Sequence, residues 1–263
     1  MRGEWIRRIA LGILVFVVGA AIAAPWIAPH GPVAQNLVAA LKAPGPGHWL
    51  GTDQYGRDEW ARILYGARLT LEIAVAAVAL GLAIGGAIGF WAGMAGGWVD
   101  AVWMRLMDIV LAFPYLLIAI AVVTALGPGA FHAAFAIGAY LVPSAARVAR
   151  SAALSLKDRD FVEAAHALGA GRWRVFARHL LPNSLSTLWT FAGVSLGRAV
   201  IFDAALSFLG LGAQPPQPSW GDMINSGRDY LLASPVLTLA PGIAILLTVA
   251  AFNFASERRA GLS

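Results

Sequence analysis

The sequence has no cysteine and little charge, and each shortage excludes a class of protein. Because none of the 263 residues is Cys, disulfide frameworks and Cys-ligated metal sites are excluded. Only 13% of the residues are charged, about half the share of a soluble domain, whereas 59% are hydrophobic. The hydrophobic residues form repeated runs of about 17–25 residues, the length that an α-helix needs to cross a bilayer. The composition therefore predicts an all-α, polytopic membrane protein.

About six hydrophobic segments are expected to span the membrane. The second and fifth contain several glycines, as is common in membrane helices that pack closely. Pro114 is expected to kink the third. Residues 59–69 suit a separate interfacial helix, for which Asp58 is the candidate N-cap. Residues 93–105 are expected to form a short loop. The six expected spans are residues 9–28, 70–92, 107–126, 131–149, 184–204 and 236–254.

The positive charges are unevenly distributed between the segments that flank the expected spans. If the N-terminus lies inside, 13 Lys and Arg residues lie in inner segments and 5 in outer segments, while Arg198 lies within a span. The positive-inside rule then places both termini and the 150–183 loop in the cytoplasm. This distribution also explains the net charge of +5 without a nucleic-acid partner.

The first span has an alternative interpretation. Arg7-Arg8 followed by an apolar run also resembles a signal peptide, whose removal would leave five spans. With the span retained, the chain divides into three parts. These are residues 1–69 (first span and outer segment), 70–256 (five-helix core) and 257–263 (cytoplasmic tail).

The 150–183 loop contains two short amphipathic patterns separated by Gly169-Ala170-Gly171. The first runs from Phe161 to Leu168 and the second from Trp173 to Leu180, after which Pro182 is expected to end the helix. Helices this short are not stable alone, so they need a protein groove or the membrane surface. Spacing alone leaves both open, and it also allows Glu163 to serve in a capping box with Asp160.

Residues 163–183 resemble the EAA loop of permease subunits in bacterial ABC importers. The matching residues are Glu163, Ala164, Ala165, Gly169, Leu181 and Pro182. In that family the loop seats in a cleft of a separate ATPase, and its glutamate faces basic residues there. The resemblance therefore implies an ATPase-coupling role for these six residues and an ABC type I importer permease fold.

Further stretches resemble the second-subunit type of the dipeptide, oligopeptide and nickel permeases. Two departures stand out: Asp203 replaces the usual Glu, and the chain after Asn253 lacks the usual acidic tail. The matching stretches are Leu50–Asp53 with Gly56–Asp58, Tyr65–Arg68, Met104-Arg105 with Asp108, Phe113-Pro114, Ala205–Gly212, Pro216–Gly221, and Pro241-Gly242 with Phe252-Asn253.

This resemblance implies a set of partners in the bacterial inner membrane. They are a related permease that completes a heterodimer, two cytoplasmic ATPases that hold ATP and Mg²⁺, and an extracytoplasmic substrate-binding protein. The expected cargo is di- or oligopeptides; nickel chelates, glutathione or another small solute are the alternative, because the external protein selects the cargo. No cofactor is expected in this chain, which has no GxxxxGK[ST] phosphate loop.

Two further regions are candidates for function. Arg198 and Asp203 are candidates for the translocation path, where Arg198 would pair with Asp203 or with an acidic group of the partner subunit. The alternative for Arg198 is that its side chain reaches the outer interface. The loop 205–235 either docks the binding protein or plugs the channel. Gln214, Pro215, Pro216 and Trp220 are its expected docking residues, and Trp220 is also a candidate interfacial anchor.

Two other classes of protein are less compatible with the sequence. A membrane enzyme would need a catalytic constellation that Asp108, Arg198 and Asp203 do not supply, and an ATP-independent transporter would not need an ATPase-docking loop. His132, His166 and His179 show no ligand spacing with carboxylates, so no metal site is expected.

Overall fold

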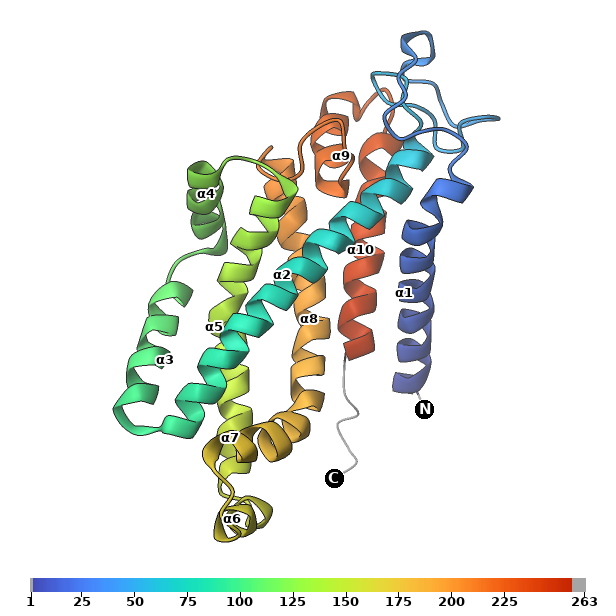
Figure 1. Cartoon of the computed structure of the whole chain (residues 1–263). Coiled ribbons are helices and arrows are strands. Elements are labelled where there is room, and N and C mark those ends of the chain that lie inside the picture. The colour runs from blue at the N-terminus through green and yellow to red at the C-terminus, as the bar shows by residue number, and fades with distance from the viewer. Residues whose placement is uncertain (1, 257–263) are drawn as a thin grey trace.

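The computed structural model describes residues 2–256, and the chain is almost entirely helical over that range (Figure 1). Two 3₁₀ turns, Leu37–Ala39 and Arg228–Tyr230, and a π-helical segment, Phe176–Leu180, complete the helical structure. The α-helices are α1 Arg2–Ile27, α2 Glu59–Ala95, α3 Gly97–Leu111, α4 Tyr115–Leu126, α5 Ala130–Lys157, α6 Asp160–Ala167, α7 Arg172–Val175, α8 Leu181–Phe208, α9 Trp220–Gly227 and α10 Val236–Ser256.

Four helical segments are long and apolar enough to cross a membrane: α1, α2, the continuous stretch Arg172–Phe208, and α10. The pair α3 and α4 passes the same test as one broken span, which makes up to five. The expected span over residues 131–149 does form a helix, α5, but α5 is not in this set. It lies between other helices, packed against α2, α8, α3 and α4. Protein rather than lipid covers much of its surface, so it needs less hydrophobicity than a lipid-facing span.

Helix α2 is longer than expected at both ends. Residues 59–69 are not a separate interfacial helix but its first turns, and most of the expected loop 93–105 is helical in α2 and α3. The division expected between residues 69 and 70 therefore falls inside a continuous helix. The predicted N-cap is confirmed, because the Asp58 side chain accepts a hydrogen bond from the Ala61 amide. At about 1.5 Å per residue, 37 residues exceed the roughly 30 Å of hydrocarbon, so α2 projects beyond the membrane.

The α2–α5 interface forms the centre of the bundle, and small residues make it possible. Gly81, Gly85, Gly89 and Gly93 recur at helical spacing on α2, all facing α5. A Cβ at Gly89 would overlap the Ala146 carbonyl, and one at Gly93 would lie 2.9 Å from the Ala153 Cβ. These positions allow the two backbones to approach closely, as glycine does in membrane helix pairs.

The third expected span bends far more sharply than a proline kink. Helices α3 and α4 meet at an angle of 88° across Ala112–Pro114. Pro114 cannot donate a backbone hydrogen bond and restricts Phe113 before it, so the helix ends there and restarts at Tyr115. The Tyr115 ring then stacks on Phe202 of α8, and its hydroxyl donates to the Phe202 carbonyl at 2.9 Å.

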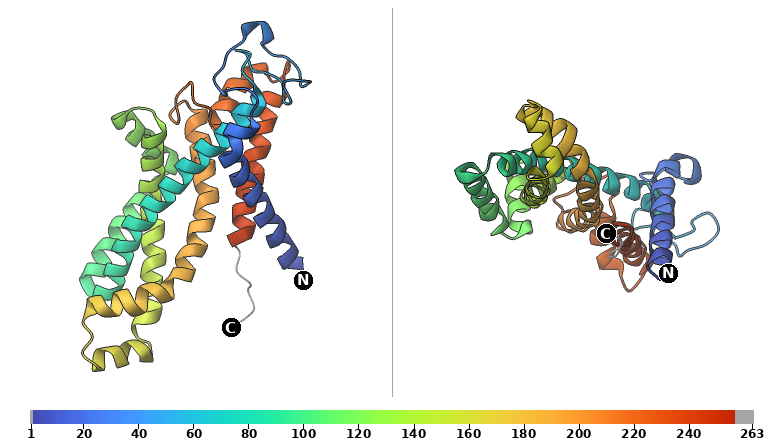
Figure 2. Two further views of the ribbon diagram at one scale, coloured as in Figure 1. Left: turned by 45° about the vertical axis from the view of Figure 1, so that its right-hand side comes forward. Right: turned by 90° about the horizontal axis from the view of Figure 1, so that it is seen from below.

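The bundle has two distinct ends (Figure 1). The α6–α7 hairpin lies at one end, together with the start of α1 and the end of α10. At the opposite end lie the α1–α2 connection, α9 and the start of α10. Figure 2 shows α1 at the edge of the bundle beside α10, consistent with its largely lipid-facing surface.

Candidate functional site

The α6–α7 hairpin, residues 158–180, has a small core of its own. Val162 and Ala165 of α6 pack with Val175 and Leu180, and Met94 at the end of α2 closes this cluster. The outer surface of the hairpin remains apolar, with exposed fractions of 88% for Leu168 and 76% for Trp173. Less than half of each predicted apolar pattern is therefore fully buried within this chain.

Gly169 makes the turn between the two helices. Its φ of +82° lies in the left-handed region, where a side chain is strained, although no atom lies within 4 Å of the position a Cβ would take. Glycine is thus required here by backbone conformation rather than by crowding. The sequence-based expectation of a turn at this glycine is confirmed.

Pro182 does not end the second helix, which corrects the sequence-based expectation. The π-helical segment shifts the register, so that the Leu181 amide donates to the Phe176 carbonyl, and Pro182 lies in the first turn of α8. A proline fits there because its missing N–H is not required. Asn183 and Ser184 donate side-chain hydrogen bonds to the His179 and Leu180 carbonyls.

The six predicted coupling residues differ in their exposure to solvent. Glu163, Ala164, Gly169 and Pro182 are exposed, Leu181 is half-buried, and Ala165 is 8% exposed inside the hairpin core. The predicted capping box is wrong: the N-cap of α6 is Arg159, without a side-chain hydrogen bond, and Asp160 is already helical. Glu163 makes no side-chain hydrogen bond or ion pair with any residue that the structure describes, so its carboxylate faces solvent.

At the other end, residues 28–58 and α9 form what we call the loop cap. Its centre is the Asp53 carboxylate, which accepts hydrogen bonds from the amides of Tyr55 and Arg57, both at 2.9 Å, and from the Arg57 side chain at 2.6 Å. Thr52 donates its hydroxyl to the Ala39 carbonyl. The loop is therefore held in place by buried polar contacts, although it is rich in Pro and Gly.

Arg62 of α2 connects the separate parts of the loop cap. Its side chain is 2% exposed and lies 3.5 Å from Asp53, 3.7 Å from Asp222 of α9 and 3.4 Å from the Pro32 carbonyl. Burial raises the pKa of the Asp222 carboxyl, and the Arg62 guanidinium opposes that rise. Sequence reasoning missed Arg62 and Asp222 because 160 residues separate them and no local spacing marks the pair.

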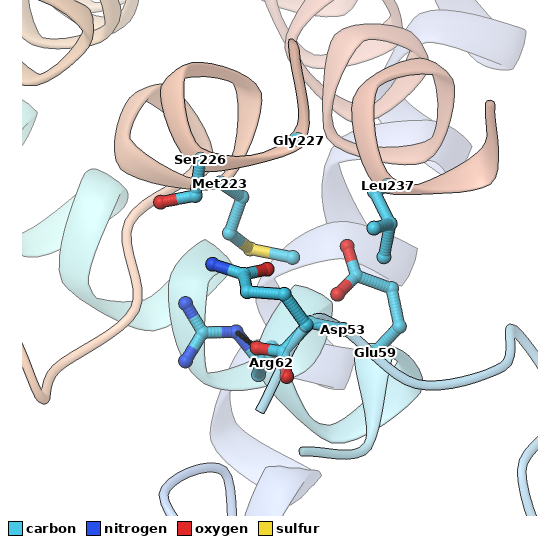
Figure 3. A pocket seen from close by; sticks show the side chains of 8 residues that line it. Asp53, Glu59, Arg62, Met223, Ser226, Gly227 and Leu237 are labelled. Atoms are coloured by element: carbon cyan, nitrogen blue, oxygen red, sulfur yellow. Dashed lines mark ion pairs between the residues drawn. The ribbon is translucent and has the colours of Figure 1, made fainter. Parts of the chain in front are cut away.

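A small cavity with room for about one water molecule lies beside Arg62 (Figure 3). Figure 3 shows Glu59 and Leu237 on one side of the cavity and Arg62 on the other, with Met223 of α9 above. Glu59 is 2% exposed, and its Oε1 has no hydrogen-bond partner among the described residues. This is a polar pocket at the junction of α2, α9 and α10.

Trp220 lies in the core, not at a surface, which corrects both surface roles expected for it. Its ring is 1% exposed, and its Nε1 donates to the Ile63 carbonyl at 3.0 Å. It fixes α9 against α2 and can neither touch an external partner nor anchor at the lipid interface. The other three predicted docking residues, Gln214, Pro215 and Pro216, are exposed.

The expected pairing of Arg198 with Asp203 is also wrong. Arg198 is exposed, whereas Asp203 is 0% exposed in the interior. Five positions apart on α8, the two residues lie on different faces. Asp203 instead lies near the Ser207 hydroxyl, at 3.4 Å, and makes no ion pair among the described residues.

Two histidines of the loop cap converge on the N-cap of α2. The Nδ1 atoms of His48 and His30 lie 2.7 Å and 3.8 Å from Oδ2 of Asp58, and the two rings stack with centroids 4.9 Å apart. The three ligand atoms all lie within 4.8 Å of one another. No sequence signal marks this cluster, because the spacings of 18 residues between His30 and His48 and of 10 between His48 and Asp58 match no local metal motif.

Comparison with known families identifies the chain. Residues 85–259 match the family described as binding-protein-dependent transport system inner membrane component, and residues 7–44 match the N-terminal TM domain of oligopeptide transport permease C. The chain belongs to the first of these families. The resemblance found in the sequence to peptide permeases of the second-subunit type is thus confirmed.

Curated relatives and a solved structure agree with this assignment. The permease is 41% identical to the glutathione transport system permease protein GsiD of Pectobacterium atrosepticum over 82% of the chain and 72% of the relative. It is 41% identical to the probable D,D-dipeptide transport system permease protein DdpC of Escherichia coli, covering 92% and 81%. It is 40% identical to the dipeptide transport system permease protein DppC of Alkalihalophilus pseudofirmus, covering 95% and 82%.

The fold matches an inward-facing structure of the MetNI methionine ABC transporter with a TM-score of 0.63, covering 74% of this permease and 93% of that chain. At 19% identity this likeness concerns the fold alone. The permease therefore has the type I importer fold and is a membrane-embedded channel subunit of an ATP-driven importer.

Proposed function

We propose that this permease carries short peptides into the cell as one half of a heterodimeric channel. Its relatives are named for the transport of dipeptides, D,D-dipeptides and glutathione, and short peptides are the chemistry these cargoes share. The chain contributes the channel and no nucleotide site, and ATP and Mg²⁺ bind to the two partner ATPases. The α6–α7 hairpin and both termini face the cytoplasm.

The observation that carries the coupling role is the exposed surface of the α6–α7 hairpin. Leu168 and Trp173 are exposed, and the Glu163 carboxylate is free beside them. Exposed apolar side chains, together with a carboxylate that has no partner among the described residues, suit a protein cleft that supplies apolar contacts and a basic residue better than they suit solvent. In this proposal the contact surface includes Glu163 and Ala164, and Gly169 forms the turn of the hairpin. Ala165 supports this surface from within the hairpin core.

On the opposite end, the exposed segment Gln214–Gln217 is proposed to dock the substrate-binding protein. Its prolines limit the conformations available before binding, so docking loses less entropy. Replacing only residues 214–217 with Gly/Ser keeps Trp220 in the core. We expect stimulation by the loaded binding protein to fall while basal ATPase activity stays low. A rise in basal activity with stimulation retained would instead identify the segment as a plug.

Reconstitution tests the function as a whole. The permease, purified with a related permease and the ATPases encoded beside it, is placed in proteoliposomes with the binding protein. We expect ATP-dependent uptake of labelled di- or tripeptides. Uptake without ATP would contradict the coupling role, and ATP-driven uptake of metal chelates with peptides ignored would contradict the cargo.

A further inference from the structure

We infer that His30, His48 and Asp58 form a binding site for a divalent transition-metal ion on the loop cap, of the kind that binds Zn²⁺. Two imidazole nitrogens and one carboxylate oxygen are the donor set of many three-ligand zinc sites. The three side chains come from separate parts of the chain: His30 follows α1, His48 lies in the turn bridged to Gly45, and Asp58 caps α2. Their convergence is produced by the tertiary structure.

The distances are close to those that a metal ion requires. With bonds of about 2.0–2.1 Å, the ligand atoms of a tetrahedral site lie about 3.3 Å apart. The His48–Asp58 separation is 2.7 Å and the His30–Asp58 separation is 3.8 Å. All three ligand atoms lie within 4.8 Å of one another. Side-chain movements, outward from Asp58 for His48 and inward for His30, would complete the geometry. The His30 side chain is 45% exposed, so the inward movement is not blocked by packing.

The two oxygens of Asp58 have separate tasks. Oδ1 accepts the amide of Ala61 at 2.8 Å, which fixes the orientation of the carboxylate, and Oδ2 faces the two histidines. A hydrogen bond of this kind from a neighbouring group commonly orients a ligand. The exposed edge of His30 leaves the fourth position to water. A bound ion would link the end of α1 to the start of α2 and so stiffen the cap.

A hydrogen bond alone does not account for His30. His48 already makes the short contact with Asp58, while His30 lies beyond hydrogen-bond distance at 3.8 Å yet directs the same nitrogen toward the same oxygen. The variant His30→Ala is therefore the sharper probe, because it removes a ligand without removing the hydrogen bond that holds the loop.

Calorimetric titration of Zn²⁺ into the full chain tests the site. The chain is purified in detergent through a tag without histidine and stripped with chelator. We expect about one Zn²⁺ per chain, at least roughly tenfold weaker binding in His30→Ala and His48→Ala, and unchanged binding in His132→Ala, whose Nδ1 contacts the Gly127 carbonyl instead. Visible absorption of Co²⁺ in the same site should report tetrahedral coordination and be lost in His30→Ala.

The melting temperature of the metal-free protein serves as the folding control, and it should be the same for His30→Ala and the wild-type chain. If the wild-type chain binds no more Zn²⁺ than the double variant His30→Ala/His48→Ala, the inference is wrong. It is equally wrong if His30→Ala binds as tightly as the wild type, because the ion would then lie elsewhere. Neither outcome bears on peptide transport, so the inference and the proposed function can fail separately.

Discussion

The α6–α7 hairpin exposes Trp173 and Leu168 and leaves Glu163 unpaired among the described residues. In the loop cap, by contrast, Trp220 is buried and the central carboxylate of Asp53 contacts Arg57 and Arg62. The two regions lie at opposite ends of the bundle, and both are rich in residues that could carry function. The charged centre of the cap is therefore completed within this chain, while the hairpin is proposed to be completed by another. An unpaired carboxylate together with exposed apolar side chains marks the hairpin as the surface proposed to meet a partner.

The largest expected effect on stability comes from removing Arg62, the buried cation that connects the parts of the loop cap. Arg62→Ala should lower the free energy of unfolding by roughly 3–5 kcal/mol, because it leaves Asp222 without a buried cation and removes one of the two buried cations that contact Asp53. Arg68→Ala is the matched control, since Arg68 pairs with Glu72 at 3.0 Å on the surface and such pairs contribute about 0–1 kcal/mol. Thermal unfolding in detergent measures both. Equal effects would contradict the picture of an internally completed cap.

Two tryptophans test the comparison directly. Trp220→Ala should destabilise the protein by about 3–5 kcal/mol, because it removes a fully buried ring and the hydrogen bond to Ile63. Trp173→Ala should change stability by less than about 0.5 kcal/mol but weaken binding of the ATPase. Unfolding and co-purification separate the two effects. The comparison fails if Trp173→Ala unfolds the permease or leaves ATPase binding intact.

A smaller effect is expected at the hairpin turn. Gly169→Val should cost about 1–2 kcal/mol locally, because valine is strained at φ +82°, and it should uncouple ATP hydrolysis from transport. Gly171→Val is the control, since Gly171 has φ −69° and open space around its Cβ position. Substrate-stimulated ATPase activity and uptake are the measurements. Normal coupling in Gly169→Val would remove the hairpin from the coupling mechanism.

Glu163→Ala should leave stability unchanged within about 0.5 kcal/mol, because its carboxylate has no partner within the described chain. Transport should nevertheless fall, since the charge that faces the ATPase is lost. Asp160→Ala provides a comparison at a neighbouring acidic position of α6. Full transport in Glu163→Ala would show that the free charge has no partner in the assembled importer.

No loss of stability is expected from single cysteines placed at the two ends of the helical bundle. Asp158→Cys and Gln217→Cys lie at exposed positions of a chain that otherwise has no cysteine. An impermeant thiol reagent should label Gln217→Cys in intact cells and Asp158→Cys only after permeabilisation. The reverse pattern would place the α6–α7 hairpin outside and invert the orientation of the whole permease.

Much of this architecture could be predicted because it depends on local properties of the sequence. Hydrophobic runs predicted where helices form, Asp58 was predicted as an N-cap, and Gly169 was predicted as a turn, each from the residue's own chemistry. The number of spans was less predictable, because α5 is covered by other helices and carries a weaker hydrophobic signal. Pro182 was misread because a π-helical segment upstream shifts the register in a way that residue types alone do not reveal.

The sequence by itself determined that this is a helical membrane protein of the importer permease family, since hydrophobicity and the order of the motifs can be recognised along the chain. Only the tertiary structure decided which groups are buried and which meet. Trp220 on Ile63, Arg62 between Asp53 and Asp222, and His30 beside His48 all join residues that are far apart in sequence or lack a local spacing signal. Their proximity follows from how the helices pack, because burial and pairing energies depend on neighbours in space.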